Sequence, residues 1–182
     1  MMLDDDLDPE VRLMPSLTVA EGILRHLAAS NHATIATIAG SQSRHPYPLG
    51  EAIRQVASDR LALASSHLRA GDYLVQRSAF RASISRHYYA MYHAARAIVF
   101  AVTKGDDHQR HNVLARNLPA TLPQRPTREQ QLTDARLLRN EADYEPYPIN
   151  EIGWAVEAHG LAATASEFMQ ALEEYALLNG HV

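Results

Sequence analysis

One segment of the chain concentrates side chains that could act on a phosphate ester. Residues 85–97 read SRHYYAMYHAARA, and within them Arg86 and His93 are seven positions apart. On an α-helix this spacing places the two side chains only about 20° apart around the axis, with Tyr89 beside them. Histidine can act as a general acid or base near neutral pH, and arginine can hold a phosphate. The alternative interpretation is a polar, partly solvated helix face.

A second polar ridge follows about fifty residues later. Arg136, Arg139, Asn140 and Asp143 occur at positions i, i+3, i+4 and i+7, which share one face of a helix. The arginines of this ridge could hold a phosphate. An Arg–Asp pair at this spacing is also a common structural ion pair, so both interpretations remain open.

Several other kinds of site are excluded or disfavoured. The chain has no cysteine, which excludes disulfides, thiolate zinc sites and cysteine nucleophiles. Neither a glycine-rich phosphate loop nor an HExxH zinc motif occurs. His108 and His111 are three apart, but two histidines alone do not make a metal site. The aspartates within residues 4–8 have the spacing that begins a calcium loop, but a proline stands where that loop needs glycine. We therefore expect no metal ion and no cofactor.

Charge is unevenly distributed along the 182 residues, whose net charge is −4. Residues 51–140 carry 14 basic and 7 acidic side chains, whereas residues 141–182 carry 8 acidic and no basic ones. The basic middle could attract phosphates or an acidic partner, or it could pair with the acidic C-terminal segment. The N-terminus, MMLDDDLDPE, lacks the basic start and apolar stretch of a signal peptide. No apolar run is long enough to cross a membrane, so we expect a cytoplasmic protein without membrane contact.

The elements that must position these side chains are predicted to be helices throughout. Valine and isoleucine are sparse, and no stretch alternates with period two. Residues 1–50 are expected to be an acidic arm, a short helix over 18–29 and a proline-containing linker over 30–50. Residues 51–182 are expected to form one antiparallel, up-and-down bundle of about five helices.

The bundle helices are expected over five ranges: 51–70, 76–103, 108–118, 127–143 and 150–178. Gly71 is expected to end the first helix, and Lys104 with Gly105 the second. Apolar side chains at steps of three and four predict the buried faces. These are Ile53, Ala57, Leu61, Ala64 and Leu68 in the first helix, Ile84, Tyr88, Met91, Ala95, Ile98 and Val102 in the second, and Trp154, Ala158, Leu161, Ala165, Phe168, Leu172 and Tyr175 in the last.

Three motifs in this order resemble the small prokaryotic HEPN proteins over about residues 51–178. The first is Ser85-Arg86-x-Tyr88-Tyr89-Ala90-Met91-Tyr92-His93-Ala94-Ala95, which is similar to the signature of their second helix. The second is His111-Asn112-Val113, and the third is Leu138-Arg139-Asn140-x-Ala142-Asp143-Tyr144. The first motif is fairly specific, and the other two gain weight only in combination with it.

The resemblance implies a five-helix bundle that forms a homodimer. It also implies frequent pairing with a minimal nucleotidyltransferase in toxin–antitoxin or defence systems. Many HEPN proteins are metal-independent ribonucleases in which both subunits contribute to one cleft. They use an arginine, a polar residue that is often asparagine, and a histidine after four to six intervening residues.

The chain departs from this pattern at the expected place. Arg139 and Asn140 begin the motif, but no histidine follows them. Arg86 and His93, with six residues between them, are the substitute on the second bundle helix. Three further Arg–His pairs have a comparable spacing: Arg25 with His32, Arg60 with His67, and Arg81 with His87.

The catalytic candidates are therefore Arg86, His93, Arg139 and Asn140, with His93 as general base or acid and the arginines holding phosphate. Further candidate site residues are Tyr89, Asp143, Tyr144 and His111. Tyr144 is the best-placed acceptor if a partner silences the protein by transferring a nucleotide group.

Three functions remain open from sequence. The chain could be a ribonuclease, a non-catalytic module that binds a nucleotide, RNA or a protein partner, or a structural helical dimer. The regular 154–175 seam could serve such a dimer. The same seam is more typical of a core helix within one chain.

Overall fold

The computed structural model describes residues 17–41 and 47–182, and in these ranges every regular element is helical. The α-helices are α1 (Val19–Ala28), α2 (His32–Ser41), α3 (Leu49–Gln76), α4 (Phe80–Thr103), α5 (Arg125–Tyr144) and α6 (Ala155–Leu178). Two short 3₁₀ helices, η1 (Leu114–Asn117) and η2 (Glu151–Trp154), lie before α5 and α6. The expectation of an all-α bundle is confirmed.

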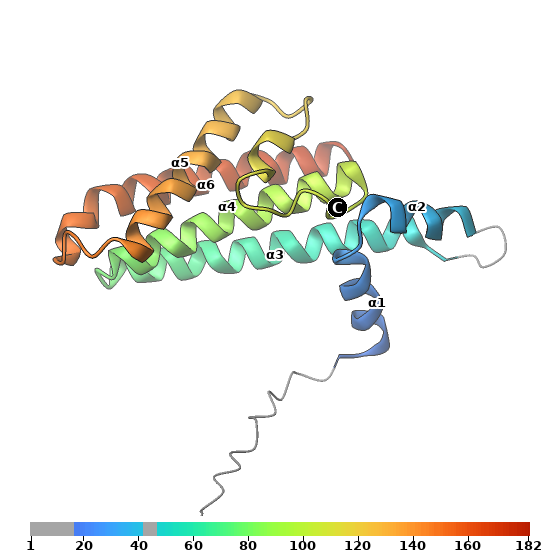
Figure 1. The fold of residues 1–182 in the computed structure, drawn as a ribbon, viewed down its shortest axis with the longest axis horizontal. Coiled ribbons are helices and arrows are strands. Elements are labelled where there is room, and N and C mark those ends of the chain that lie inside the picture. Colours follow the sequence, from blue (N-terminus) through green and yellow to red (C-terminus); the bar gives the residue numbers. More distant parts are fainter. Residues whose placement is uncertain (1–16, 42–46) are drawn as a thin grey trace, which may run out of the picture.

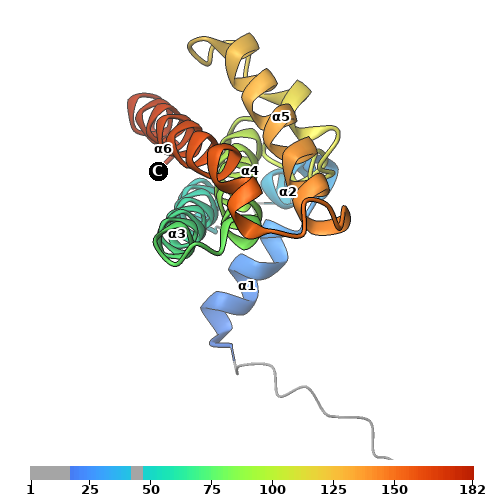
Figure 2. The same cartoon turned by 90° about the vertical axis from the view of Figure 1, so that its left-hand side faces the viewer.

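Helix α4 is the centre of the bundle. It contacts α3, α5 and α6, and the end-on view shows those three helices arranged around it (Figures 1 and 2). Helices α3, α4 and α6 run side by side, whereas α5 lies obliquely across α4 (Figure 1). The predicted buried faces of the three long helices are confirmed, except that Leu68 is only partly buried and Val102 is 40% exposed. The 154–175 seam lies in the core of the chain itself, as the intrachain interpretation expected.

The expected end of the first bundle helix at Gly71 is wrong, because α3 continues to Gln76. Gly71 faces the fully buried ring of His87 on α4, and a Cβ built at Gly71 would lie 2.6–2.8 Å from three ring atoms. The Nε2 atom of His87 lies 3.0 Å from Oδ1 of Asp72. The glycine therefore permits close packing between α3 and α4 instead of ending the helix.

Two further expectations are corrected. The linker expected over residues 30–50 contains α2, whose Ile35 is buried in a second core with Leu27, Ile53 and Phe100. Residues 108–118 form turns followed by the single turn of η1 instead of an α-helix. The expected acidic arm, residues 1–16, lies outside the described residues.

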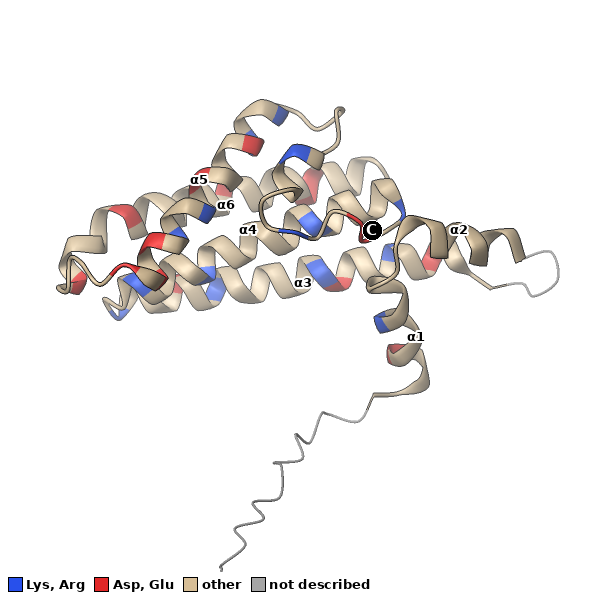
Figure 3. Ribbon diagram, viewed as in Figure 1, with Lys and Arg blue, Asp and Glu red and all other residues tan. Residues whose placement is uncertain are grey.

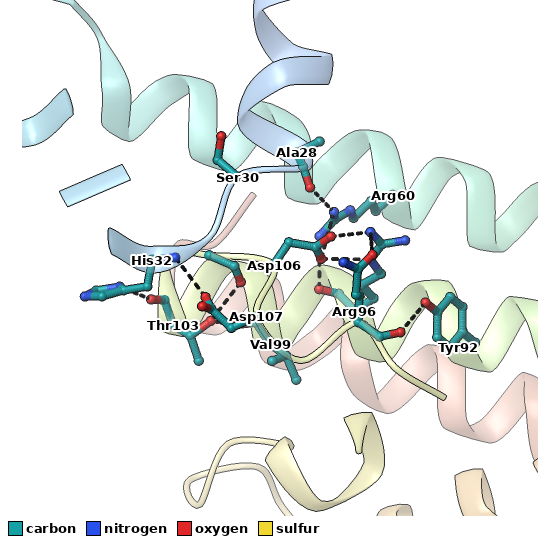
Figure 4. Close-up of polar contacts among 12 residues, drawn as sticks. Ala28, Ser30, His32, Arg60, Tyr92, Arg96, Val99, Thr103, Asp106 and Asp107 are labelled. Atoms are coloured by element: carbon teal, nitrogen blue, oxygen red, sulfur yellow. Dashed lines mark hydrogen bonds and ion pairs between the residues drawn. The ribbon is translucent and has the colours of Figure 1, made fainter. Parts of the chain in front are cut away.

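A buried ion cluster connects the N-terminal helices to the loop after α4. Asp106 lies between Arg60 and Arg96, with 3.1 Å from Oδ1 to Arg60 Nη2 and 2.8 Å from Oδ1 to Arg96 Nε (Figure 4). Arg60 also donates to the carbonyl of Ala28 at 2.6 Å, and the Asp106 amide donates to the carbonyl of Ser30 at 2.9 Å. Burial lowers the pKa of Arg60 to about 10, and the neighbouring Asp106 opposes that shift. The loop that leads to His111 is therefore anchored to α1 and to the segment that follows it.

Candidate functional site

The open face of α4 carries the candidates expected there. Arg86 is exposed, and Tyr89 and His93 are half-buried, while Ile84 and the rest of its ridge are buried. The α-helical geometry places these polar side chains on one face because the intervening residues pack against α3, α5 and α6. The expected convergence of an arginine, a phenol and an imidazole on one face of α4 is therefore present.

A histidine of α3 joins this face. The rings of His67 and His93 are stacked, with centroids 5.3 Å apart and planes 4° apart. Nη1 of Arg86 lies 3.4 Å from Nδ1 of His67, and the ring of Tyr89 lies 5.7 Å from that of His67. Arg86, His67 and His93 thus form one continuous cationic and imidazole cluster between α3 and α4.

The imidazoles of this cluster favour the neutral form. Burial lowers the pKa of His93 to about 4, and the nearby His67 and Arg96 add to the shift. Burial also lowers the pKa of His67, with a contribution from Arg86. A neutral imidazole can accept a proton, and an anion bound beside these groups would raise the pKa of each ring. The site is suited to a negatively charged ligand.

Helix α5 contributes Arg139, whose guanidinium is held by several groups. Its Nη2 donates to the hydroxyl of Tyr89 at 2.8 Å, and its Nε lies 2.7 Å from Oδ2 of Asp143 in an ion pair. Asp143 also accepts a hydrogen bond from the hydroxyl of Ser85. Because Tyr89 also lies beside His93, with ring centroids 6.3 Å apart, it links the α4 and α5 candidates.

The remaining candidates lie around Arg139. Asn140 accepts from Nη1 of Arg139 at 3.2 Å. Tyr144 is 73% exposed, and Cζ of Arg139 lies 5.8 Å from the centroid of its ring. His111 forms a hydrogen bond through Nδ1 with the hydroxyl of Tyr88, and its ring stacks on Tyr92 at 4.2 Å. Burial lowers the pKa of His111, and Arg139 and Arg136 contribute.

A surface pocket opens between the His111 loop and α5. Its volume is about 480 Å³, and its lining consists of basic and amide side chains together with His111. The lining residues are Arg110, His111, Asn112, Arg136, Arg139 and Asn140. With three arginines and no carboxylate in its lining, the pocket can receive a phosphate. Basic and acidic positions are both distributed along the bundle (Figure 3), and the three arginines of the lining make this pocket a local concentration of positive charge.

Sequence reasoning missed His67 and Arg110 as members of the site, and it placed Arg136 on the ridge of Arg139 without naming it among the candidate site residues. The Arg60–His67 pair has the same spacing as Arg86–His93, but nothing in the sequence indicated that the two histidines would stack. The two arginines that were expected to act together have different contacts. Arg86 contacts His67 of α3, whereas Arg139 contacts Tyr89 of α4 and Asp143 of α5. His108 takes no part in any of these contacts.

Over residues 17–41 and 47–182, no group of three histidine, aspartate or glutamate side chains is arranged to hold a metal ion. None of the helices in these ranges is long and apolar enough to cross a membrane.

Comparisons with known proteins identify the fold family. The family model for the HEPN domain matches residues 57–175, which is more than half of the chain and includes α4, α5 and most of α3 and α6. Searches of curated proteins and of solved structures found no match. The matched range contains the His67–His93 stack, Arg139 and the pocket beside it. By this match the chain belongs to the HEPN domain family.

Proposed function

We propose that this HEPN protein binds single-stranded RNA and cleaves it with His93 as general base. The RNA would lie across the surface formed by Arg86, Tyr89 and His93 of α4 and Arg139 of α5, which we call the α4–α5 face. The HEPN domain indicates a function related to RNA or nucleotides. The observation that carries the proposal is the stacked His67–His93 pair beside Tyr89 and Arg139. This arrangement combines a neutral imidazole with cations and aromatic surfaces on which bases can stack.

The proposed reaction needs a base, a phosphate-binding group and a source of a proton. Neutral His93 would take the proton from a ribose 2′-hydroxyl, whose oxygen then attacks the adjacent phosphorus atom. The bond to the 5′-oxygen breaks, the leaving oxygen takes a proton from water or a protonated imidazole, and a 2′,3′-cyclic phosphate remains. Arg86 and Arg139 would hold the phosphate and stabilise its charge.

The second candidate is a binding module without turnover. Two observations favour it: the guanidinium of Arg139 is already engaged by Asp143 and Tyr89, and the pKa of His93 is far below neutral. A base with so low a pKa removes protons less effectively than one that titrates near pH 7. Binding of the phosphate would raise the pKa of His93. The ribonuclease and the binding module would therefore be distinguished by the state of His93 in the RNA complex more than by its state in the free protein.

Homodimer formation and pairing with a minimal nucleotidyltransferase belong to the same proposal. Membership of the HEPN family supports this proposal, as does the solvent exposure of Arg86 on the α4–α5 face, where a partner could bind. Tyr144 would be the acceptor of a transferred nucleotide group because it is exposed and lies beside Arg139. Co-expression with such a partner should add a nucleotide mass to the peptide that contains Tyr144, and the Tyr144→Phe variant should remain unmodified.

The test of the main proposal is cleavage of a 5′-labelled single-stranded RNA, together with growth inhibition on expression. We compare wild type with His93→Ala, Arg139→Ala and, as a histidine control outside the site, His159→Ala on α6. We expect His93→Ala to lose about 100-fold or more in rate, since a general base contributes on that scale, and His159→Ala to match wild type. Wild-type protein that binds RNA without cutting it would refute the ribonuclease and support the binding module. Wild-type protein that neither binds nor cuts would refute both.

A further inference from the structure

A large cavity lies away from the α4–α5 face. It is a groove of about 670 Å³ at the end of the bundle where α2, the start of α3 and the end of α4 meet the C-terminal residues (Figure 1). Its volume falls in the range of small-molecule sites in proteins. We call it the end groove, and it has no role in the function proposed above.

The floor of the end groove is apolar. Ile35 of α2, Leu49 and Ile53 of α3 and Ala101 of α4 line it, and all four are buried in the core. Apolar surface of this kind favours a ligand with an apolar body because burying that body removes it from water.

The polar side chains around the end groove are basic or imidazole groups. They are His32, Arg54, Lys104 and His181, and no aspartate or glutamate lines the groove. The side chains of Arg54 and Lys104 form no ion pair or hydrogen bond with any other described residue. By contrast, Arg60 and Arg96 in the same part of the molecule share Asp106. Two free cations at an apolar groove are therefore available to an anionic group.

The backbone at one edge of the groove adds a further attraction for negative charge. Helix α3 begins there, and its N-cap residue Pro48 offers no side-chain hydrogen bond to the first turn. Gly50 lines the groove, and a Cβ built on it would lie 3.9 Å from Nη1 of Arg54. The guanidinium of Arg54 thus lies close to the positive end of the helix dipole, and both favour an anion at the same edge.

We propose that the end groove binds a small organic anion with an apolar body, such as an aliphatic carboxylate. The carboxylate lies between Arg54, Lys104 and the first turn of α3, and the apolar body lies on Ile35 and Ile53. This site is separate from the proposed RNA site and does not depend on it.

The test is a titration of ¹⁵N-labelled full-length protein with sodium octanoate, followed by amide chemical shifts. Gly50 and Gly180 line the end groove, whereas Gly22 lines a different pocket and Gly160 lies on α6. We expect the Gly50 and Gly180 signals to shift with saturation while those of Gly22 and Gly160 stay in place. Octanol and sodium acetate, which lack the carboxylate and the long chain respectively, should bind at least tenfold more weakly.

Variants separate this site from general surface binding. Arg54→Gln and Lys104→Gln should each weaken octanoate binding by about threefold or more, as expected for a partly exposed charge. Ala39→Trp places a large side chain in the groove from an exposed position and should abolish binding without removing a charge. Arg69→Gln, on the exposed surface of α3, is the charge-matched control and should bind like wild type.

Any of four outcomes would overturn the proposal. The first two are shifts that spread equally to Gly22, and unchanged binding in both Ala39→Trp and the Arg54→Gln/Lys104→Gln double variant. The others are a loss of affinity in Arg69→Gln as large as in Arg54→Gln, and a folded protein with no saturable shifts at all.

Discussion

At the level of single residues, the surroundings of His93 determine the protonation state of its ring. Its ring is half-buried, stacks on a second imidazole and lies near cations. Each of these conditions penalises the charged ring, so His93 carries no proton at neutral pH. Its type and position on α4 follow from the sequence, whereas its pKa depends first on burial in the folded chain and then on His67 from another helix.

The lowered pKa of His93 predicts a loss of stability in mild acid. The unfolded chain binds a proton near pH 6.5, whereas the native ring binds one only near pH 4. As the pH falls from about 6.5 towards 4, the unfolded state takes up a proton that the native state does not. The free energy of unfolding should therefore be lower at pH 5 than at pH 7.5, as measured by urea denaturation.

His67, His111 and His181 act in the same direction, since burial lowers the pKa of each. The His93→Gln variant should consequently retain only part of the pH dependence. A wild type with equal stability at both pH values, or a variant with an undiminished difference, would contradict the assignment.

At the scale of elements, the contact between α3 and α4 depends on a residue without a side chain. Gly71 lies against the ring of His87, and the ring in turn contacts Asp72 one residue later. A helical glycine usually weakens a helix, and this one read from sequence as a helix end. Its use inside α3 is explained only by a partner from α4.

This packing predicts opposite effects for two glycine substitutions. In Gly71→Ala the new methyl group would lie under 3 Å from a fully buried ring, so we expect a loss of about 1–3 kcal/mol in stability. In Gly160→Ala, within α6, the methyl group meets nothing within 4 Å, so we expect a gain of about 0.5–1 kcal/mol. Thermal or urea unfolding of both variants measures the difference. Equal effects in the two variants would refute the packing explanation.

At the scale of the whole molecule, the helices outside the HEPN match are part of the folded unit. Residues of α1 and α2 share a core with α3 and Phe100, and Asp106 links the loop after α4 to Arg60 of α3. The same loop leads to His111, which borders the candidate site. We therefore expect the N-terminal helices to help hold the loop that carries His111.

Removal of the Asp106 carboxylate tests this connection. In Asp106→Ala the buried guanidinium of Arg60 loses its counter-ion, so we expect a loss of about 3–5 kcal/mol in stability. Glu129→Gln removes a partly exposed ion pair with Arg125, at 3.9 Å, and should cost less than about 1 kcal/mol. Urea unfolding compares the two, and a similar small cost in both variants would show that Asp106 is not a structural anchor.

Residue patterns alone predict the helical class, the buried faces of α3, α4 and α6, and the open face of α4 with Arg86, Tyr89 and His93. These features follow from helical periodicity, which is a local property of the chain. It also indicated the Arg139–Asp143 pair, since residues four apart meet on one helix.

Four features became visible only in the folded chain: His67 stacks on His93, Tyr89 joins Arg139 to α4, α3 continues through Gly71, and α2 packs on the bundle. Each of these features depends on contacts between residues far apart in sequence. Such contacts are set by how whole elements pack, and the spacing of residues within one element does not encode them.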